Sequence, residues 1–120
     1  MVRLEIPLRA VPKGRARSGN SGQHYTPART RAFEQDCQAH LFFQYRDPPL
    51  EGKLSVTLIF YGNPRGDLDN LAKSVLDAAQ ADKRLAWKGV FKNDSQIDDL
   101  WIRRERDKID MILMLVEQRE

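Results

Sequence analysis

The residues best suited to chemistry lie together near the middle of the chain: Asp67, Asp69, Asn70 and Lys73. Carboxylate oxygens are the ligands that hard divalent cations prefer, and a nearby ammonium can neutralise charge that develops on a phosphate. This stretch therefore has the residue types that metal-assisted phosphate chemistry requires. It also has an ordinary structural explanation, in which Asp67 caps a helix and Asp69 pairs with Lys73 at i, i+4 spacing. The stretch alone leaves both explanations open.

A helix and a preceding strand must position these side chains. Apolar residues recur at i, i+3, i+4 and i+7 from Leu68 onward, which predicts an amphipathic helix from residue 66 to about Arg84. Asp77 lies two turns after Asp69 in this helix. Residues 53–61 alternate between apolar and other side chains, which predicts a strand directly before it. Both carboxylates therefore emerge at the end of a strand, where loops commonly build sites.

The other elements complete a single α/β domain over residues 1–120. Residues 2–9 alternate as in a half-buried strand, with Pro7 favouring a sheet edge or an irregular strand end, and residues 10–26 are predicted to be a loop. A second helix is predicted from Thr26-Pro27 to just before Asp47. Strands follow near Ile97 and over residues 109–116, the last apolar on both faces like a central strand. The order β-α-β-α-β-β predicts an α+β arrangement of two main helices packed on a mixed sheet.

Charge is unevenly distributed although the net charge is only +3. Between Glu5 and Glu34 there is no acidic residue, and this interval contains Arg9 and the residues that we expect to contact nucleic acid: Lys13, Arg15, Arg17, Arg29 and Arg31. A basic region of this kind indicates a polyanionic partner, most often DNA or RNA. A merely solvated basic face would look the same in the sequence.

Cysteine content and the N-terminal sequence indicate a cytoplasmic protein. The single Cys37 cannot form an internal disulfide, which fits a reducing compartment, and it falls on the apolar stripe of the first helix. The first residues carry charge from Arg3 onward and lack the long apolar run of a signal peptide. No apolar run is long enough to span a bilayer, so no membrane partner is expected.

Two motifs resemble those of a known family. The first is Asp67-Leu68-Asp69-Asn70-Leu71-Ala72-Lys73, with Asp77 after it, and the second runs from Gly89 through Asn93-Asp94 to Ile97. Together with Tyr25-Thr26-Pro27 behind a basic segment, they resemble the RusA-type Holliday junction resolvases, in the variant seen in phage and prophage members. The resemblance covers essentially the whole chain, and the combination of both motifs makes it specific.

The resemblance implies a Mg²⁺-dependent endodeoxyribonuclease that resolves four-way DNA junctions in recombination and repair, with Mn²⁺ as a possible substitute and no small-molecule cofactor. Its metal ligands would be Asp67, Asp69 and Asp94, with Lys73 also needed for cleavage. Asn70, Asp77 and Asn93 would support the site. The resemblance also implies a homodimer, because one site cannot make paired nicks at once.

The chain departs from the family pattern in two places. The family often has Asp-Asp where this chain has Asn93-Asp94, and the spacing between Asp77 and Gly89 is longer, which we interpret as an extra helical turn. From the residues alone, Asp94 is equally explained as a turn residue. A non-catalytic protein that binds branched DNA is the main alternative, and a small protein-interaction domain is a second.

Overall fold

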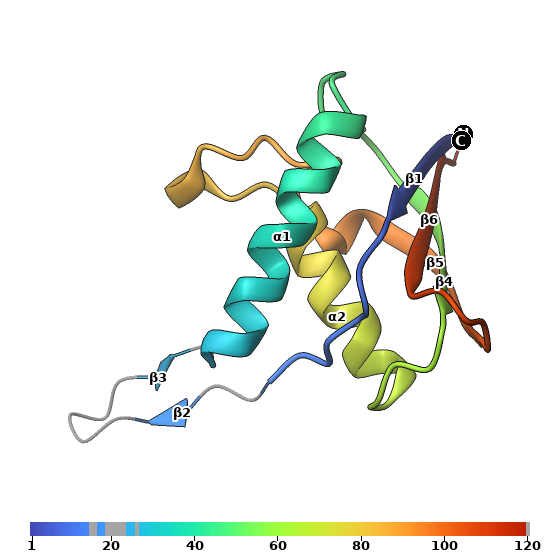
Figure 1. The fold of residues 1–120 in the computed structure, drawn as a ribbon. Helices are drawn as coiled ribbons and strands as arrows, with labels where there is room; N and C mark the ends of the chain where they lie inside the picture. Colours follow the sequence, from blue (N-terminus) through green and yellow to red (C-terminus); the bar gives the residue numbers. More distant parts are fainter. Residues whose placement is uncertain (15–16, 19–23, 26, 120) are drawn as a thin grey trace.

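Two helices cover one face of a four-stranded mixed sheet in the computed structural model, which describes residues 1–14, 17–18, 24–25 and 27–119 (Figure 1). The sheet consists of β1 (Val2–Ile6), β4 (Leu54–Tyr61), β5 (Ile97–Glu105) and β6 (Met111–Gln118). The helices are α1 (Ala28–Gln44) and α2 (Leu68–Ala79). The predicted order β-α-β-α-β-β is confirmed, as is the mixed sheet.

The strand order is β1-β6-β4-β5. β4 pairs with β5 in parallel, with Leu58 opposite Ile102, and with β6 in antiparallel, with Leu58 opposite Met114. The strand that is apolar on both faces, β6, lies between β1 and β4 as predicted. β1 is an edge strand that pairs with β6, and it ends at Ile6, directly before Pro7; both agree with the edge position or irregular strand end that Pro7 favoured.

One apolar face of each helix packs on the sheet. Leu71, Val75 and Ala79 of α2 are fully buried, as are Cys37 and Leu41 of α1. Burial raises the pKa of the Cys37 thiol far above its ordinary value, so this cysteine is a core residue and not a nucleophile. Both helices thus turn their other faces toward solvent, and the acidic motif lies on that side of α2.

The chain around residues 10–26 differs from the predicted loop. Arg17–Ser18 (β2) and His24–Tyr25 (β3) form a short antiparallel ladder, which we call the β2–β3 arm, and it extends from the body beside the start of α1 (Figure 1). The prediction of a loop is therefore wrong at these four residues, because their backbones pair with each other as strands. Pro27 is the N-cap residue of α1 and not its first helical residue, and Thr26 lies outside the described residues.

Helix α2 ends at Ala79, five residues before the predicted end at Arg84. The next residues turn away because other backbone groups replace the helical hydrogen bonds: Val90 N–H donates to the carbonyl of Ala79 at 2.8 Å. A short 3₁₀ turn, η1 (Lys83–Leu85), follows, so the extra residues form a loop and not an extra turn of α2. In the described part of the chain, no helix is long and apolar enough to cross a membrane.

Candidate active site

The two carboxylates at the start of α2 are exposed to solvent. Asp67 is the N-cap residue with an extended backbone, but its side chain makes no capping hydrogen bond. One oxygen of Asp69 accepts a hydrogen bond from the backbone N–H of Asn70 at 3.0 Å. The capping explanation therefore accounts for the position of Asp67 and not for its carboxylate, which stays available to a ligand.

Lys73 pairs with carboxylates that lie beyond it in the chain. Its Nζ is 3.1 Å from Asp77 Oδ1, one helical turn later, and 3.6 Å from Asp94 Oδ2. Among the described residues Asp69 forms no ion pair with Lys73, so the i, i+4 pairing expected with Asp69 is made with Asp77. The hydrogen bond to Asp77 raises the pKa of Lys73, partial burial opposes this rise, and Asp94 adds to it. Lys73 is thus a firmly protonated cation that two carboxylates hold.

Asp94 begins a second 3₁₀ turn, η2 (Asp94–Gln96), whose cap is the residue before it. The Asn93 side chain accepts from Ser95 N–H at 2.8 Å, and the Gln96 side chain accepts from Asn93 N–H at 3.1 Å, which completes a capping box. Asn and Asp cap equally well. Asn93 thus serves as a cap, and the adjacent Asp94 carboxylate is left to face Lys73.

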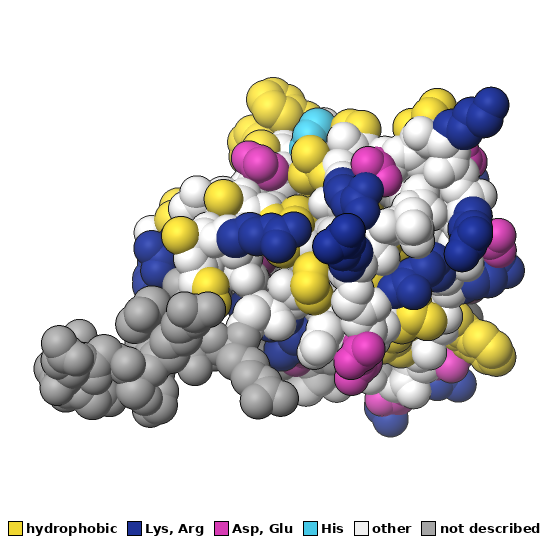
Figure 2. All heavy atoms as spheres, turned by 60° about the horizontal axis from the view of Figure 1, so that its bottom comes forward, with side chains coloured by type: hydrophobic (Ala, Val, Ile, Leu, Met, Phe, Trp, Pro, Cys, Tyr) yellow, Lys and Arg dark blue, Asp and Glu magenta, His cyan; other side chains and the backbone are white. Residues whose placement is uncertain are grey.

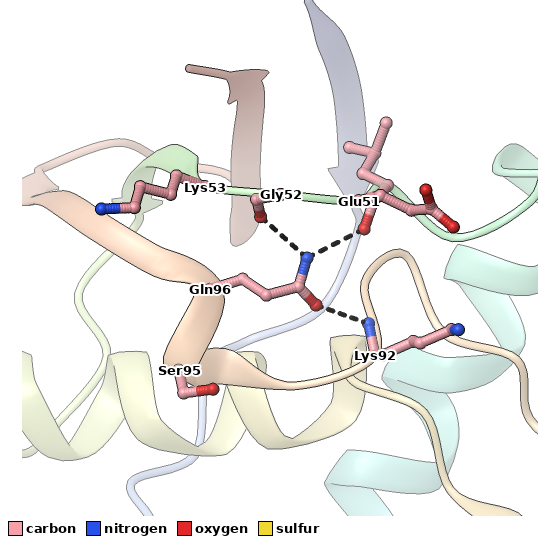
Figure 3. A pocket seen from close by; sticks show the side chains of 7 residues that line it. Glu51, Gly52, Lys53, Lys92, Ser95 and Gln96 are labelled. Atoms are coloured by element: carbon pink, nitrogen blue, oxygen red, sulfur yellow. Dashed lines mark hydrogen bonds between the residues drawn. The ribbon is translucent and has the colours of Figure 1, made fainter. Parts of the chain in front are cut away.

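The Gln96 amide also joins η2 to the turn before β4. It donates to the carbonyls of Leu50 and Gly52 at 3.0 and 2.9 Å and accepts from Lys92 N–H at 3.0 Å (Figure 3). These bonds cross a hollow that is also lined by Glu51, Lys53, Lys92 and Ser95. Gln96 therefore fixes the second motif to the body of the protein.

The loop between α2 and η2 brings Asp94 back to the helix. Trp87 is buried and donates its indole N–H to the carbonyl of Ala78 at 2.8 Å. Gly89 has φ +81°, and a Cβ there would lie 2.5 Å from Ala81 N, so only glycine fits so close an approach. Beyond it, Asp94 N–H donates to the Gln80 side chain at 3.1 Å. The longer spacing between the two motifs thus does not carry Asp94 away from α2.

Asp77 lies at the centre of a chain of ion pairs that the sequence did not reveal. Lys13 Nζ lies 3.0 Å from Asp77 Oδ2 and 2.6 Å from Glu34 Oε1 of α1. Partial burial lowers the pKa of Lys13, but hydrogen bonds to Glu34 and Asp77 raise it more, so the net shift is upward. The i, i+4 spacing of Lys73 and Asp77 was a readable signal. Nothing in the sequence linked Glu34 or Lys13 to them.

The five basic residues predicted to contact DNA are placed differently. Arg29 and Arg31 are exposed on the first turn of α1, whereas Lys13 points inward to its two carboxylates. Arg15 lies outside the described residues, and of Arg17 only the backbone, in β2, is described. Figure 2 shows Lys and Arg side chains across the middle of one face, interspersed with Asp and Glu. DNA contact by these residues stays a prediction.

The donor set fits a hard divalent cation in its chemistry, because Asp67, Asp69 and Asp94 offer only carboxylate oxygens. Asp67 in particular has no competing capping bond. Within the described residues, however, no group of three or more His, Cys, Asp or Glu side chains converges as a metal cluster. The start of α2 and η2 each offer carboxylates, and of the three aspartates Asp94 is the one within ion-pair distance of Lys73 among the described residues.

Comparison with protein families gives one match that covers most of the chain. A family model described as Endodeoxyribonuclease RusA matches residues 7–112, a range that includes both motifs and every residue of the ion-pair chain. No curated protein matches the sequence.

Proposed function

The chain belongs to the RusA endodeoxyribonuclease family, and from this premise we propose that it resolves four-way (Holliday) DNA junctions by paired, Mg²⁺-dependent nicks. Such an activity would serve DNA recombination and repair. Two observations carry the proposal: Lys73 meets Asp94, which comes from a separate segment, and the exposed Asp67 side chain at the start of α2 makes no capping hydrogen bond. A structural pair of helix-capping residues needs neither feature.

The catalytic roles divide between the two segments. Asp67, Asp69 and Asp94 would hold the cation, for which Mn²⁺ could substitute. A bound Mg²⁺ would supply Lewis-acid polarisation of the scissile phosphate. Lys73, held by Asp77 and Asp94, would neutralise the charge that develops on that phosphate during cleavage. The ammonium is set in place before the substrate arrives, so little reorganisation accompanies the reaction.

The same carboxylates oppose DNA when no cation is bound. Their charges repel the phosphates of the substrate, so neutral variants should bind a junction in the absence of Mg²⁺ at least as well as the wild type does. Arg29 and Arg31 would supply part of the sequence-independent phosphate contact, with affinity falling steeply as salt rises. The residues of the β2–β3 arm would supply the rest.

Junction symmetry suggests a homodimer. A four-way junction has two-fold symmetry, and a C2 dimer presents two sites related by the same operation. Light scattering of the purified protein at micromolar concentration should give the mass of two chains, with each dimer nicking two opposed strands in one binding event. A stable monomer that releases singly nicked junctions would contradict this assembly.

The deciding experiment compares Asp67→Asn with wild type on a synthetic four-way junction in Mg²⁺, with a linear duplex as the substrate control. Asp82→Asn is the matched control variant, because the Asp82 side chain does cap a turn, accepting from Arg84 N–H at 3.1 Å. We expect wild type and Asp82→Asn to cut the junction, and Asp67→Asn to bind it without cutting. Equal cutting by all three would refute the site, and junction binding without any cutting would support a non-catalytic DNA-binding protein.

A further inference from the structure

The segment that leads into the β2–β3 arm is fixed to the first turns of α2. Lys13 N–H donates to the carbonyl of Asn70 at 3.0 Å, and the buried Ser74 hydroxyl donates to the carbonyl of Val11 at 2.5 Å. Pro12 packs on Gly66, where a Cβ would lie 2.9 Å from the proline ring. The backbone of residues 11–13 thus lies along α2 from its start to its second turn.

This backbone position places the Lys13 ammonium next to the Asp77 carboxylate, at the oxygen that Lys73 does not contact. Asp77 divides its two oxygens: Oδ2 takes Lys13 at 3.0 Å and Oδ1 takes Lys73 at 3.1 Å. The side chains of Asp77 and Lys13 are only 15% and 24% exposed, against 53% for Lys73. The Lys13–Asp77 ion pair is therefore largely shielded from solvent, whereas the Lys73 side chain is about half exposed.

A single ion pair on an exposed helix face does not fix a lysine, because the long side chain gives up entropy for a small, salt-screened gain. Asp77 differs from such a partner because Lys13 already holds its carboxylate in one orientation. Lys13 is in turn held by Glu34 at 2.6 Å and by its own backbone bond to Asn70. Lys73 therefore meets an acceptor that is fixed in advance.

We propose that Asp77 is a positioning residue for Lys73 and that Lys13 fixes Asp77 for that task. The proposal rests on the proposed function, in which Lys73 acts on the scissile phosphate. It assigns Lys13 to the internal organisation of the site and not to phosphate contact. It also explains why a basic residue at the root of the arm points inward.

The first test measures single-turnover cleavage of a four-way junction at saturating enzyme. Displacing a catalytic group by about 1 Å can cost on the order of 100-fold, so we expect Asp77→Asn to lower the rate by about 10- to 100-fold and Lys13→Met by a smaller factor. Junction affinity without Mg²⁺ should change less than about 2-fold for both. Glu5→Gln, which removes an ion pair with Arg3 on the edge strand β1, is the matched control and should change neither quantity.

A double-variant cycle separates positioning from a general structural role. If Asp77 acts through Lys73, Asp77→Asn should lower the rate no further once Lys73→Met is present, because the group that it positions is gone. A further loss equal to that in the wild-type background would overturn the proposal. So would a Lys13→Met variant that weakens junction binding as strongly as Arg29→Gln does while leaving the cleavage rate unchanged.

The second test does not depend on cleavage. In the metal-free and DNA-free protein, the Lys73 side-chain NMR resonances should shift, and their order parameter should fall, in Asp77→Asn and in Lys13→Met but not in Glu5→Gln. Unchanged Lys73 resonances in both variants would overturn the proposal even if the enzyme cleaves junctions. A wild-type protein that cuts no branched DNA would refute the proposed function, while the resonances would still show whether Lys13 and Asp77 fix Lys73.

Discussion

The two halves of the polar face of α2 differ in how their charges are satisfied. At the start, Asp67 makes no side-chain capping bond, and within the described residues Asp69 accepts only from the N–H of its neighbour Asn70. One to two turns later, Lys73 and Asp77 are joined to each other and to groups from two other segments. The same helix thus carries one region whose carboxylates form no ion pair among the described residues and one whose charges are already paired.

This difference separates what the protein prepares from what a ligand must complete. Paired charges stabilise their own geometry in the free protein, whereas carboxylates without an ion-pair partner have no such support. The second half therefore holds the Lys73 ammonium in place in the free protein, and in the proposed function the carboxylates of the first half would bind a metal cation from solution. A carboxylate that serves only the fold would be expected in a capping bond, as Asp82 is.

The largest effect on junction cleavage should come from neutralising the carboxylates at the start of α2. Asp67→Asn and Asp69→Asn should each lower junction cleavage by about 1,000-fold, equivalent to about 4 kcal/mol of transition-state stabilisation, because each would remove a proposed cation ligand. Gel assays of single-turnover cleavage in Mg²⁺ measure this. Wild-type rates in either variant would place the chemistry elsewhere.

Replacing Asp67 should have little effect on the stability of the fold. A capping Asp contributes about 1 kcal/mol, but Asp67 makes no capping bond, so Asp67→Ala should change the free energy of unfolding by less than about 0.5 kcal/mol. Asp82→Ala, at a bonded cap, should cost about 1 kcal/mol by urea denaturation. Equal losses in the two variants would restore the capping explanation.

Substitutions in the loop between α2 and η2, which brings Asp94 back to the helix, should lower both the free energy of unfolding and the cleavage rate. Gly89→Ala combines a positive φ with contacts of 2.5 Å to backbone atoms, so it should destabilise the fold by about 2–5 kcal/mol. Gly52 has φ +76° but open space around its Cβ position, so Gly52→Ala should cost only about 1–2 kcal/mol. Urea denaturation compares the two, and a Gly89→Ala cost no larger than that of Gly52→Ala would contradict the close packing.

The smallest effect should come from the exposed cations of α1. Arg29→Gln should reduce the slope of log affinity against log salt for junction binding by about 1 and leave the cleavage rate at saturation unchanged. Arg3→Gln, on the edge strand β1, is the matched control and should leave the slope unchanged. Fluorescence anisotropy over a salt series measures both, and equal slopes in the two variants would remove α1 from the DNA-binding surface.

Much of the fold was predictable because hydrophobic periodicity reports burial directly. The alternation in β4 and the continuous apolar run in β6 specified which strand faces were buried, and the i, i+3, i+4 pattern of α2 specified its packed face. The end of α2 was not predictable. Residues 77–85 have good helix propensity, but the segment that folds back, including Trp87 and Val90, takes up the carbonyls of the last turn, and the helix ends at Ala79.

The candidate site was predictable only in its parts. Asp67, Asp69 and Lys73 could be singled out because they are close in sequence, and Asp94 only by resemblance to a family. That Lys73 turns toward Asp77 and Asp94, and not toward Asp69, depends on how the loop after α2 folds back. The inward orientation of Lys13 depends on Glu34 of α1, which no local pattern connects with α2.

The central claim is that the start of α2 and Asp94 act on one cation, and Mn²⁺ titration followed by NMR tests it most directly. Paramagnetic broadening falls steeply with distance, so the amide signals of Asp67, Asp69 and Asp94 should broaden together at low Mn²⁺. Asp67→Asn should weaken the broadening at Asp94 as well as at the start of α2, and Asp82→Asn should not. Broadening confined to one segment, or unchanged in Asp67→Asn, would contradict a shared site.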